Sequence, residues 1–465
     1  MLTRPIAEGF VGRAAELAAL EKQHRRQGAA FVPLYGRRRV GKTELLLRFC
    51  AGKRAVYFAA TQGAAPQQLR SFMRTAAAAL GKGVLGELDP RDWEHALERV
   101  LEAAGPKPLV LVLDEFQWLC ESAPELPSVL QKLWDHRWQR RPGFFLVLCG
   151  SYVGFMEREV LGARSPLFGR RTGSIKLEPL TFREAGGFFP RWPEEDRARA
   201  WCICGGVPAY LKAFDPHRSV DQNIVDAFLE VDAPLMREAE FLLREELRDV
   251  GSYATLVEAL AAGHATPTAL SRFAGIPVPR VMFFLKTLLE LGYVERKEPL
   301  VPGRPSRKLA RYVVSDPLLR FWFRFVAPHF SAIRRGPAKE AFRQLVAPQL
   351  EPFYGAGFEA LCREALPRLL AAEGVDGATR VGEFWSPTAQ IDVVALRADR
   401  WTLLGECKWG AVPSLPKVHA ELLSKAAAYP SSGVTVDLRV FARKKLKGAV
   451  PSGLKVHDLA QLYRA

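Results

Sequence analysis

Residues 36–43 read Gly36-Arg37-Arg38-Arg39-Val40-Gly41-Lys42-Thr43 and decide the fold of the first part of this 465-residue chain. The octapeptide follows the pattern GxxxxGK(S/T) and stands between an apolar run over 31–35 and a helix start over 43–49. Backbone N–H groups of such a turn and of the helix N-terminus bind phosphate oxygens. The stretch therefore predicts a P-loop whose eight residues line a nucleotide. Lys42 is expected at the β- and γ-phosphates, and the Thr43 hydroxyl on Mg²⁺.

Strand-like apolar runs alternate with helical stretches over the first 180 residues, which is the rhythm of a parallel β-sheet. The expected strands are 31–35, 55–59, 109–113, 144–148 and 174–177. We expect an α/β chain with further domains behind this sheet. The predicted divisions are a P-loop nucleotide-binding domain over 1–180, a helical lid over 181–247, a winged helix over 248–318, a helical connector over 319–345 and a last α/β domain over 346–465.

Two acidic residues end the buried run 109–113, which is the Walker B form. Asp114 is expected to hold the water shell of Mg²⁺, and Glu115 to polarise the attacking water as general base. The alternative is an acidic strand end that caps the next helix. Ser151 follows the run 144–148, where its hydroxyl is expected beside the γ-phosphate as a sensor. A serine in this position is also a common helix N-cap.

The stretch 248–318 follows the order helix, short helix, turn, helix and two strands, which is the outline of a winged helix. Its third helix, 279–291, carries only Arg280, Lys286 and Glu290 as charged residues, which is sparse for reading DNA bases. The loop and its flanks are more basic and suit contact with phosphates. They hold Arg296, Lys297, Arg304, Arg307, Lys308 and Arg311. Contact with DNA and a structural or protein-docking role both remain open for this domain.

The last part of the chain holds a second candidate site. Asp392 lies near the start of an apolar strand, and Glu406 and Lys408 end the following one. Because side chains alternate along a strand, Glu406 and Lys408 point to one face, where Asp392 can join them. The two carboxylates are expected to hold Mg²⁺, and the lysine to position or deprotonate a water for attack on a phosphodiester. The alternative is a binding module in which the acids form a salt bridge with Lys408.

The composition indicates a multidomain protein with polyanionic partners. Lys and Arg number 66 against 50 Asp and Glu, which gives a net charge of +16. Such an excess favours DNA or RNA through counterion release, although ordinary solubility is the alternative. The seven cysteines are scattered without a CxxC pair and are expected to be reduced core residues. With neither a signal peptide nor a membrane-length apolar run in the sequence, we expect a cytoplasmic location and no membrane partner.

Several motifs occur in an order that resembles archaeal-type DEXX-box ATPases, which belong with the STAND and replication-initiator branch of P-loop ATPases. Beside the P-loop, they are Phe10-Val11-Gly12-Arg13, Asp114-Glu115-Phe116-Gln117, Cys149-Gly150-Ser151, Pro166-Leu167-Phe168-Gly169-Arg170 and Gly205-Gly206-Val207-Pro208-Ala209-Tyr210-Leu211. The resemblance covers about the first 320 residues. It implies that the nucleotide is ATP, that residues 10–13 border the adenine, and that the stretch from Gly206 to Pro208 senses the nucleotide from the lid. For Val11 and Pro208 the alternatives are simple packing and a turn.

The same resemblance implies an arginine finger. Arg170 or Arg171 would act on a neighbouring subunit of a homo-oligomer, because a cation aimed at the γ-phosphate stabilises charge in the transition state. A surface ion pair is the alternative for these residues.

The last region resembles the PD-(D/E)xK restriction-endonuclease-like fold, on the residues Asp392, Glu406 and Lys408. Glu359 matches the upstream acidic residue of that family, which makes it a further expected metal ligand. Ile391 departs from the pattern, because it stands where the motif has proline.

Two functions follow from these expectations. The first is an ATP-driven switch that acts on DNA, with metal-dependent nuclease activity in the last domain. The second is a signalling or scaffold ATPase with protein partners and an inactive nuclease-like domain.

Overall fold

The computed structural model describes residues 10–303, 309–375, 377, 379–399, 401–412, 414–430 and 436–464. Its internal contacts divide the chain into two compact units, Met1–Pro179 and Leu180–Ala465, and each is described by itself. The predicted division of the second unit into lid, winged helix, connector and nuclease-like domain stays a prediction.

A five-stranded parallel sheet forms the centre of the first unit, with the strand order β2-β3-β4-β1-β5. The strands are β1 (Ala30–Tyr35), β2 (Ala55–Ala59), β3 (Leu109–Asp114), β4 (Phe144–Gly150) and β5 (Ile175–Lys176). Strands β1, β3 and β4 are buried along their whole length, because helices cover both faces of the sheet. All five predicted strands are present, each within two residues of its expected bounds.

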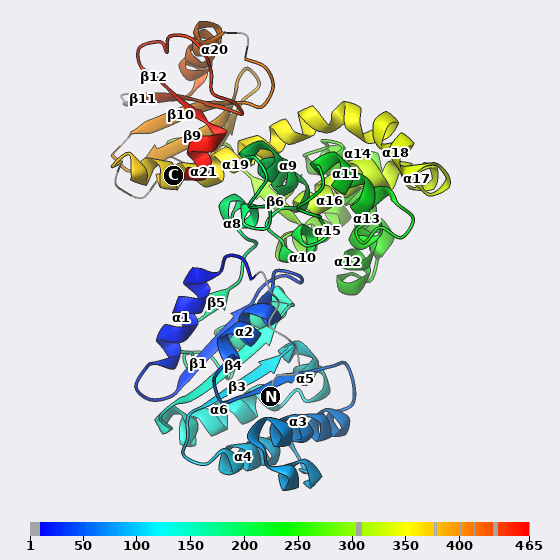
Figure 1. Ribbon diagram of the computed structural model, residues 1–465, viewed down its shortest axis with the longest axis vertical. Coiled ribbons are helices and arrows are strands. Elements are labelled where there is room, and N and C mark those ends of the chain that lie inside the picture. Colours follow the sequence, from blue (N-terminus) through cyan, green and yellow to red (C-terminus); the bar gives the residue numbers. More distant parts are fainter. Residues whose placement is uncertain are drawn as a thin grey trace. The chain divides into compact units, whose positions relative to one another are not determined.

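Helices cover the two faces of this sheet unequally (Figure 1). One face packs against α1 (Ala14–His24) and α2 (Lys42–Cys50), and the other packs against α3 (Ala65–Leu80), α4 (Trp93–Ala104), α5 (Phe116–Ser122) and α6 (Leu126–His136). Short helical segments complete the unit: Gly83–Glu87, Trp138–Arg140, α7 (Val153–Phe155) and Met156–Val160. The sheet and the helices on its two faces thus form a three-layer α/β sandwich of the P-loop NTPase kind, as predicted.

The second unit begins with helices. They are α8 (Phe182–Gly186), α9 (Glu194–Cys204), α10 (Pro208–Leu211), α11 (Val220–Ile224), Val225–Leu229, α12 (Glu238–Glu246), α13 (Val250–Ala261), α14 (Pro267–Ala274) and α15 (Val278–Glu290). A hairpin of β6 (Val294–Lys297) and β7 (Arg311–Val314) follows. The Thr266 side chain caps α14, as its sequence predicts, by accepting a hydrogen bond from the Ala269 N–H.

A chain of short helical segments then leads to one long helix. The segments are α16 (Pro317–Phe321), Trp322–Val326, Ala327–His329, α17 (Phe330–Arg335), α18 (Ala338–Ala341), Phe342–Val346 and Ala347–Gln349, and the long helix is α19 (Leu350–Ala372).

A second five-stranded sheet follows, with the order β12-β11-β10-β9-β8. Its strands are β8 (Thr379–Trp385), β9 (Gln390–Arg397), β10 (Thr402–Lys408), β11 (Val436–Ala442) and β12 (Leu454–Asp458). Strands β8, β9 and β10 pair antiparallel, whereas β10, β11 and β12 pair parallel. Helices α19 and α21 (Leu459–Arg464) pack on one face, and α20 (Leu415–Ala428) packs on the other. The result is a separate C-terminal α/β layer structure with a mixed sheet.

The β6–β7 hairpin packs on the edge strand β8. The Leu300 N–H donates to the Glu383 carbonyl at 2.8 Å, and the Trp385 indole N–H donates to the Leu309 carbonyl at 2.9 Å. Lys297 also forms an ion pair with the Glu383 carboxylate at 2.6 Å. The first of these bonds satisfies the Glu383 carbonyl, a backbone group that an edge strand otherwise leaves open to another chain.

All seven cysteines are free thiols, and all except the partly exposed Cys407 are buried, which agrees with the expectation of reduced core residues. Within the described ranges, none of the helices combines the length and the apolar character needed to cross a membrane.

Candidate nucleotide-binding site

The P-loop connects the end of β1 to the start of α2. A side chain has no room at Gly36, where a Cβ atom would lie 2.3 Å from the Leu177 carbonyl oxygen. Gly41 has a φ of 92°, which favours glycine, and Arg39 adopts a left-handed φ of 67°. Strained backbone of this kind is common where a loop must wrap a ligand. The loop therefore depends on both glycines of the motif.

Lys42 already turns its ammonium group into the loop. Its Nζ donates to the Gly36 carbonyl at 2.9 Å and to the Arg37 carbonyl at 2.8 Å, and the residue is only 6% exposed. Burial lowers the pKa of Lys42, while the nearby Asp114 and Glu115 act in the opposite direction. A buried ammonium held by two carbonyls can exchange them for phosphate oxygens, and the role of Lys42 at the phosphates stays a prediction.

Asp114 collects hydrogen bonds at the end of β3. Its Oδ2 accepts from the Thr43 hydroxyl at 3.1 Å and from the Tyr57 hydroxyl, while its Oδ1 accepts from the Glu115 N–H at 2.9 Å. The residue is 2% exposed. A hydroxyl and a carboxylate side by side are the oxygen ligands that Mg²⁺ prefers, so Thr43 and Asp114 fit this ion. Tyr57 lies on β2, and its contact was not predicted.

Glu115, Gln117 and Ser151 form a hydrogen-bonded triangle. The Ser151 hydroxyl donates to Glu115 Oε2 at 2.6 Å, and the Gln117 amide donates both to the same oxygen and, at 3.2 Å, to Ser151 Oγ. Glu115 adopts a left-handed φ of 53° before α5. The structure therefore brings the predicted base and the predicted sensor into direct contact. It adds Gln117, which the sequence analysis left without a role.

Residues 11–13 contact the P-loop through one side chain. The Arg13 guanidinium donates to the Val40 carbonyl at 3.0 Å and pairs with Glu16 at 2.9 Å. Gly12 and Arg13 both have positive φ angles, of 71° and 66°. The segment with Val11 is thereby held against the loop, as a segment that borders the nucleotide requires.

Pro208 belongs to the second unit, where it begins α10. Gly206 lies against the Leu180 backbone, because Leu180 N–H donates to the Gly206 carbonyl at 2.7 Å and a Cβ at Gly206 would meet Leu180 oxygen at 1.7 Å. The predicted sensing role of Pro208 stays a prediction.

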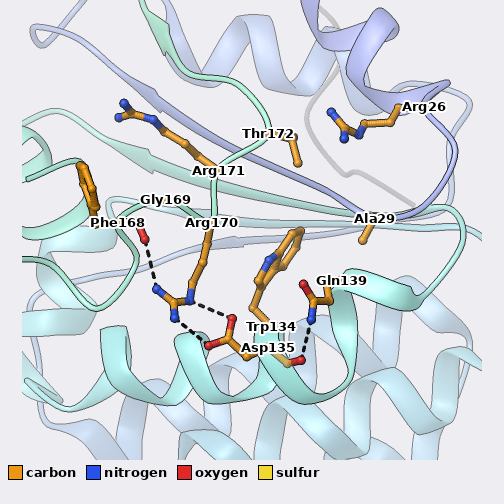
Figure 2. Close-up of a pocket in the computed structure, with 10 residues that line it drawn as sticks. All are labelled: Arg26, Ala29, Trp134, Asp135, Gln139, Phe168, Gly169, Arg170, Arg171 and Thr172. Carbon is orange, nitrogen blue, oxygen red and sulfur yellow. Dashed lines mark hydrogen bonds and ion pairs between the residues drawn. The ribbon is translucent and has the colours of Figure 1, made fainter. Parts of the chain in front are cut away.

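Arg170 lines a polar pocket of about 680 Å³ in the first unit (Figure 2). Its guanidinium forms two hydrogen bonds with the Asp135 carboxylate, at 2.8 and 2.7 Å, and two more with the Pro166 and Phe168 carbonyls. The hydrogen bonds that Arg170 donates to the Asp135 carboxylate raise the pKa of Arg170. Arg171 points away from this group and is exposed. Arg170 thus forms an ion pair, which was the alternative to its role as an arginine finger. To act as an arginine finger, Arg170 would have to leave Asp135.

The second unit brings its own predicted site residues together on β9 and β10. Asp392 is 7% exposed and Glu406 is 5% exposed. Asp392 Oδ2 accepts from the Cys407 N–H at 2.9 Å. Glu406 lies between two ammonium groups, with Lys408 Nζ at 2.9 Å from Oε1 and Lys425 Nζ at 2.6 Å from Oε2. Lys425 comes from α20, and the sequence analysis missed it.

Glu359 faces this cluster from α19. Burial and the charge of Asp392 raise the pKa of Glu359 to about 7, and burial and Glu406 raise the pKa of Asp392 to about 6. Across the described ranges, no three His, Cys, Asp or Glu side chains form a group that can hold a metal ion. The three expected ligands therefore do not fit Mg²⁺ in this arrangement, because Lys408 and Lys425 occupy both oxygens of Glu406.

Basic residues around the β6–β7 hairpin are largely engaged within the chain. Lys297 pairs with Glu383, Arg296 pairs with Glu298 at 2.6 Å, and the Arg311 guanidinium lies 4.8 Å from the Trp385 ring centre. Arg304, Arg307 and Lys308 lie outside the described residues. The phosphate contacts expected of the described hairpin residues therefore compete with these internal partners.

Comparisons with known proteins find similarity over the first unit and beyond it. Residues 10–214 match the family described as an ATPase domain predominantly from Archaea. Residues 322–421 match a family described as Archaea bacterial proteins of unknown function, so the nuclease-like character of the last region stays a prediction. An uncharacterized protein of Methanocaldococcus jannaschii is 28% identical over 425 residues, which cover 90% of this chain and 92% of the relative.

Two solved structures align with part of this chain. The Walker-type ATPase of Pyrococcus abyssi aligns with a TM-score of 0.51 and 21% identity, over 68% of this chain and 96% of that one. The ORC2 protein of Aeropyrum pernix aligns with a TM-score of 0.44 and 14% identity, over 76% of this chain and 98% of that one. This chain thus has the fold of a P-loop NTPase, and its residues 10–214 are similar to the archaeal ATPase domain family.

Proposed function

We propose that the protein binds ATP at residues 36–43 and hydrolyses it. The observation that carries the proposal is the meeting of Lys42, Thr43, Asp114 and Glu115 at the ends of β1 and β3. Binding residues alone would suit a nucleotide sensor. A carboxylate placed directly after the metal-binding Asp114 adds a base for water, and hydrolysis needs that base.

Each residue has one task in this proposal. Backbone N–H groups at the start of α2 bind the phosphates, and Lys42 exchanges its two carbonyl partners for phosphate oxygens. Thr43 and Asp114 hold the cation, which when bound neutralises charge on the phosphates. Glu115 takes a proton from the attacking water as the water oxygen bonds to the γ-phosphorus, while the bond from that phosphorus to the bridging oxygen breaks and ADP leaves.

Two variants test the proposal. Lys42→Ala is expected to lose ATP binding, and Glu115→Gln is expected to keep binding and lose turnover, when binding is measured by calorimetry and turnover by phosphate release. A wild-type protein that fails to bind ATP refutes the proposal. Turnover in Glu115→Gln equal to wild type refutes the role of Glu115.

A second candidate activity concerns the second unit. We propose that it acts on DNA and that the nucleotide bound by the first unit controls this action. The approach of Asp392, Glu406, Lys408 and Lys425 supports a site for a phosphodiester, because two lysines can bind phosphate oxygens. The net charge of +16 supports a polyanionic partner. Metal-dependent cleavage additionally requires that a lysine releases Glu406.

An assay with plasmid DNA separates this activity from its alternative. The protein is incubated with DNA and Mg²⁺ or Mn²⁺, with and without ATP, beside Asp392→Ala and Lys42→Ala. Metal-dependent nicking that Asp392→Ala loses supports a nuclease. Neither nicking nor retention of DNA by wild type favours a signalling or scaffold ATPase with protein partners.

One observation favours that scaffold alternative. Helix α15 presents Val278, Met282 and Phe283 to solvent, with exposures of 38%, 41% and 63%. An apolar surface on the helix that would enter the major groove suits a protein partner better than DNA bases.

A further inference from the structure

Gln117 holds a position that the proposed roles do not use. It lies in the first turn of α5, two residues after the proposed base, and is 8% exposed. Its amide nitrogen donates to Glu115 Oε2 and to Ser151 Oγ. Both donors of the side chain are therefore directed at the residues expected around the γ-phosphate.

Chemistry determines which end of the amide faces Glu115. An ionised carboxylate only accepts hydrogen bonds, so the NH₂ group must face it and the carbonyl oxygen must point elsewhere. That oxygen, Oε1, is buried and has no hydrogen-bond partner among the described residues. It lies beside Gly150, where a Cβ atom would stand 3.1 Å from it and 2.6 Å from the sulfur of the buried Met156, so a water reaches Oε1 only when this packing opens. Buried acceptors without a partner are rare, and they occur where a ligand or water supplies the missing donor.

A second buried glutamine shows what a structural role looks like in the same unit. Gln68 is 2% exposed, and its amide donates to the Trp118 carbonyl at 3.2 Å and to Ser122 Oγ at 3.1 Å. Its Oε1 accepts from the Thr61 N–H at 3.4 Å. Gln68 is thus satisfied at both ends by the protein, whereas Gln117 is satisfied only at its donor end.

We propose that Gln117 positions the attacking water, with its amide holding Glu115 and Ser151 in place and its Oε1 accepting a hydrogen bond from that water. The inference rests on the proposed hydrolysis of ATP. In the reaction, the water oxygen bonds to the γ-phosphorus while the bond from that phosphorus to the bridging oxygen breaks. Glu115 takes one water proton, and the other stays on the product phosphate and is the one bonded to Gln117. Two acceptors on one water fix its lone pair toward the phosphorus.

A role in restraining Glu115 predicts that the loss of Gln117 changes turnover in the opposite direction. If Gln117 and Ser151 only held Glu115 away from the water, then removing the amide would free the base and raise turnover. Removing a residue that positions the water lowers turnover, and it lowers it without weakening the binding of nucleotide, since no phosphate contact is lost. The direction of the change in kcat therefore separates the two roles.

The test compares Gln117→Leu, which keeps the volume and removes both polar ends, with the matched control Gln68→Leu. We expect Gln117→Leu to lower kcat by about 10- to 100-fold with KM within about twofold of wild type. The control is expected to keep its kcat. Gln117→Asn keeps the amide but is one methylene shorter, and its kcat is expected to lie between those of Gln117→Leu and Gln68→Leu. This variant provides the test if Gln117→Leu does not fold.

A binding measurement excludes a merely structural effect. ADP with aluminium fluoride imitates the transition state together with its attacking water, whereas ADP alone does not. Gln117→Leu is expected to lose affinity for the aluminium fluoride complex in proportion to kcat, and to bind ADP as wild type does. Equal or raised kcat in both Gln117 variants, or equal loss of affinity for both ligands, overturns the inference. A wild-type protein that binds ATP without turning it over instead refutes the proposed hydrolysis, and the inference falls with it.

Discussion

The hydrogen bond from Tyr57 to Asp114 gives a prediction of stability for the first unit. Tyr57 comes from β2, and its hydroxyl donates to Oδ2 of a carboxylate that is 2% exposed. Burial and the charge of Asp114 raise the pKa of Tyr57, so that its hydroxyl remains a donor across the working pH range. Tyr57→Phe keeps the ring and removes only this donor.

The acceptor sets the magnitude of the effect. A hydrogen bond to a charged group contributes about 1.5–3 kcal/mol, against about 0.5–1.5 kcal/mol for one to a neutral group. Asp114 keeps its bonds from Thr43 and from the Glu115 N–H, so the loss is one bond and not a fully unpaired carboxylate. For a unit of this size, each kcal/mol shifts the melting temperature by about 2–4 °C, which gives a decrease of about 3–12 °C.

Calorimetry of the full chain measures this shift. The transition that moves to higher temperature when Mg²⁺ and ATP are added identifies the first unit. Tyr429→Phe is the matched control, because its hydroxyl donates to a neutral acceptor, the Leu300 carbonyl, at 3.0 Å in the second unit. An unchanged first-unit transition in Tyr57→Phe, or a decrease no larger than that of the control in its own transition, refutes the reasoning.

Further predictions concern turnover, cleavage and pH. Lys42→Ala is expected to raise the Kd for ATP more than about 100-fold by calorimetry, since both the charge and its phosphate contacts are lost. Arg170→Ala is expected to lower turnover while sparing ATP binding if Arg170 is a finger; if its ion pair is only structural, Asp135→Asn will give the same turnover as Arg170→Ala. Metal-dependent nicking requires that a lysine first releases Glu406. Where the wild type shows this nicking, Asp392→Asn is expected to abolish it and to leave phosphate release intact. Because burial raises the pKa of Glu359 to about 7 and that of Asp392 to about 6, the folded second unit binds protons that the unfolded chain releases. Without divalent metal, its urea midpoint is therefore expected to rise as the pH falls from about 8 to about 5, and a midpoint that falls over this range contradicts the sign.

The sequence predicted the centre of the first sheet well because its strands β1, β3 and β4 are buried on both faces. Runs such as 109–113 and 144–148 are continuous and apolar, a pattern that a helix with one exposed side does not show. The P-loop and the residues that follow β3 and β4 were placed correctly at the ends of those strands. In parallel strands these ends share one edge of the sheet, so the meeting of Lys42, Asp114 and Ser151 follows from strand direction.

Contacts that depend on strand order or on the packing of a helix over a sheet were not predictable from the sequence. Tyr57 reaches Asp114 only because β2 lies beside β3, and strand order is not visible in a single sequence. Lys425 reaches Glu406 because α20 packs over β10, and its spacing in the chain shows no relation to that strand. The role of Gln117 was missed for another reason: its signal is an unpaired oxygen, which exists only in three dimensions.

The packing of the β6–β7 hairpin on β8 has a consequence for biosynthesis. Chains are made from the N-terminus, so Leu300 leaves the ribosome well before Glu383, with which it pairs. When the edge strand of the second sheet emerges, the segment that covers it has already been made. Strand β8 can therefore pair with this segment as soon as it emerges, before a neighbouring nascent chain reaches it. A circular permutant in which the hairpin follows the sheet is expected to aggregate more during translation.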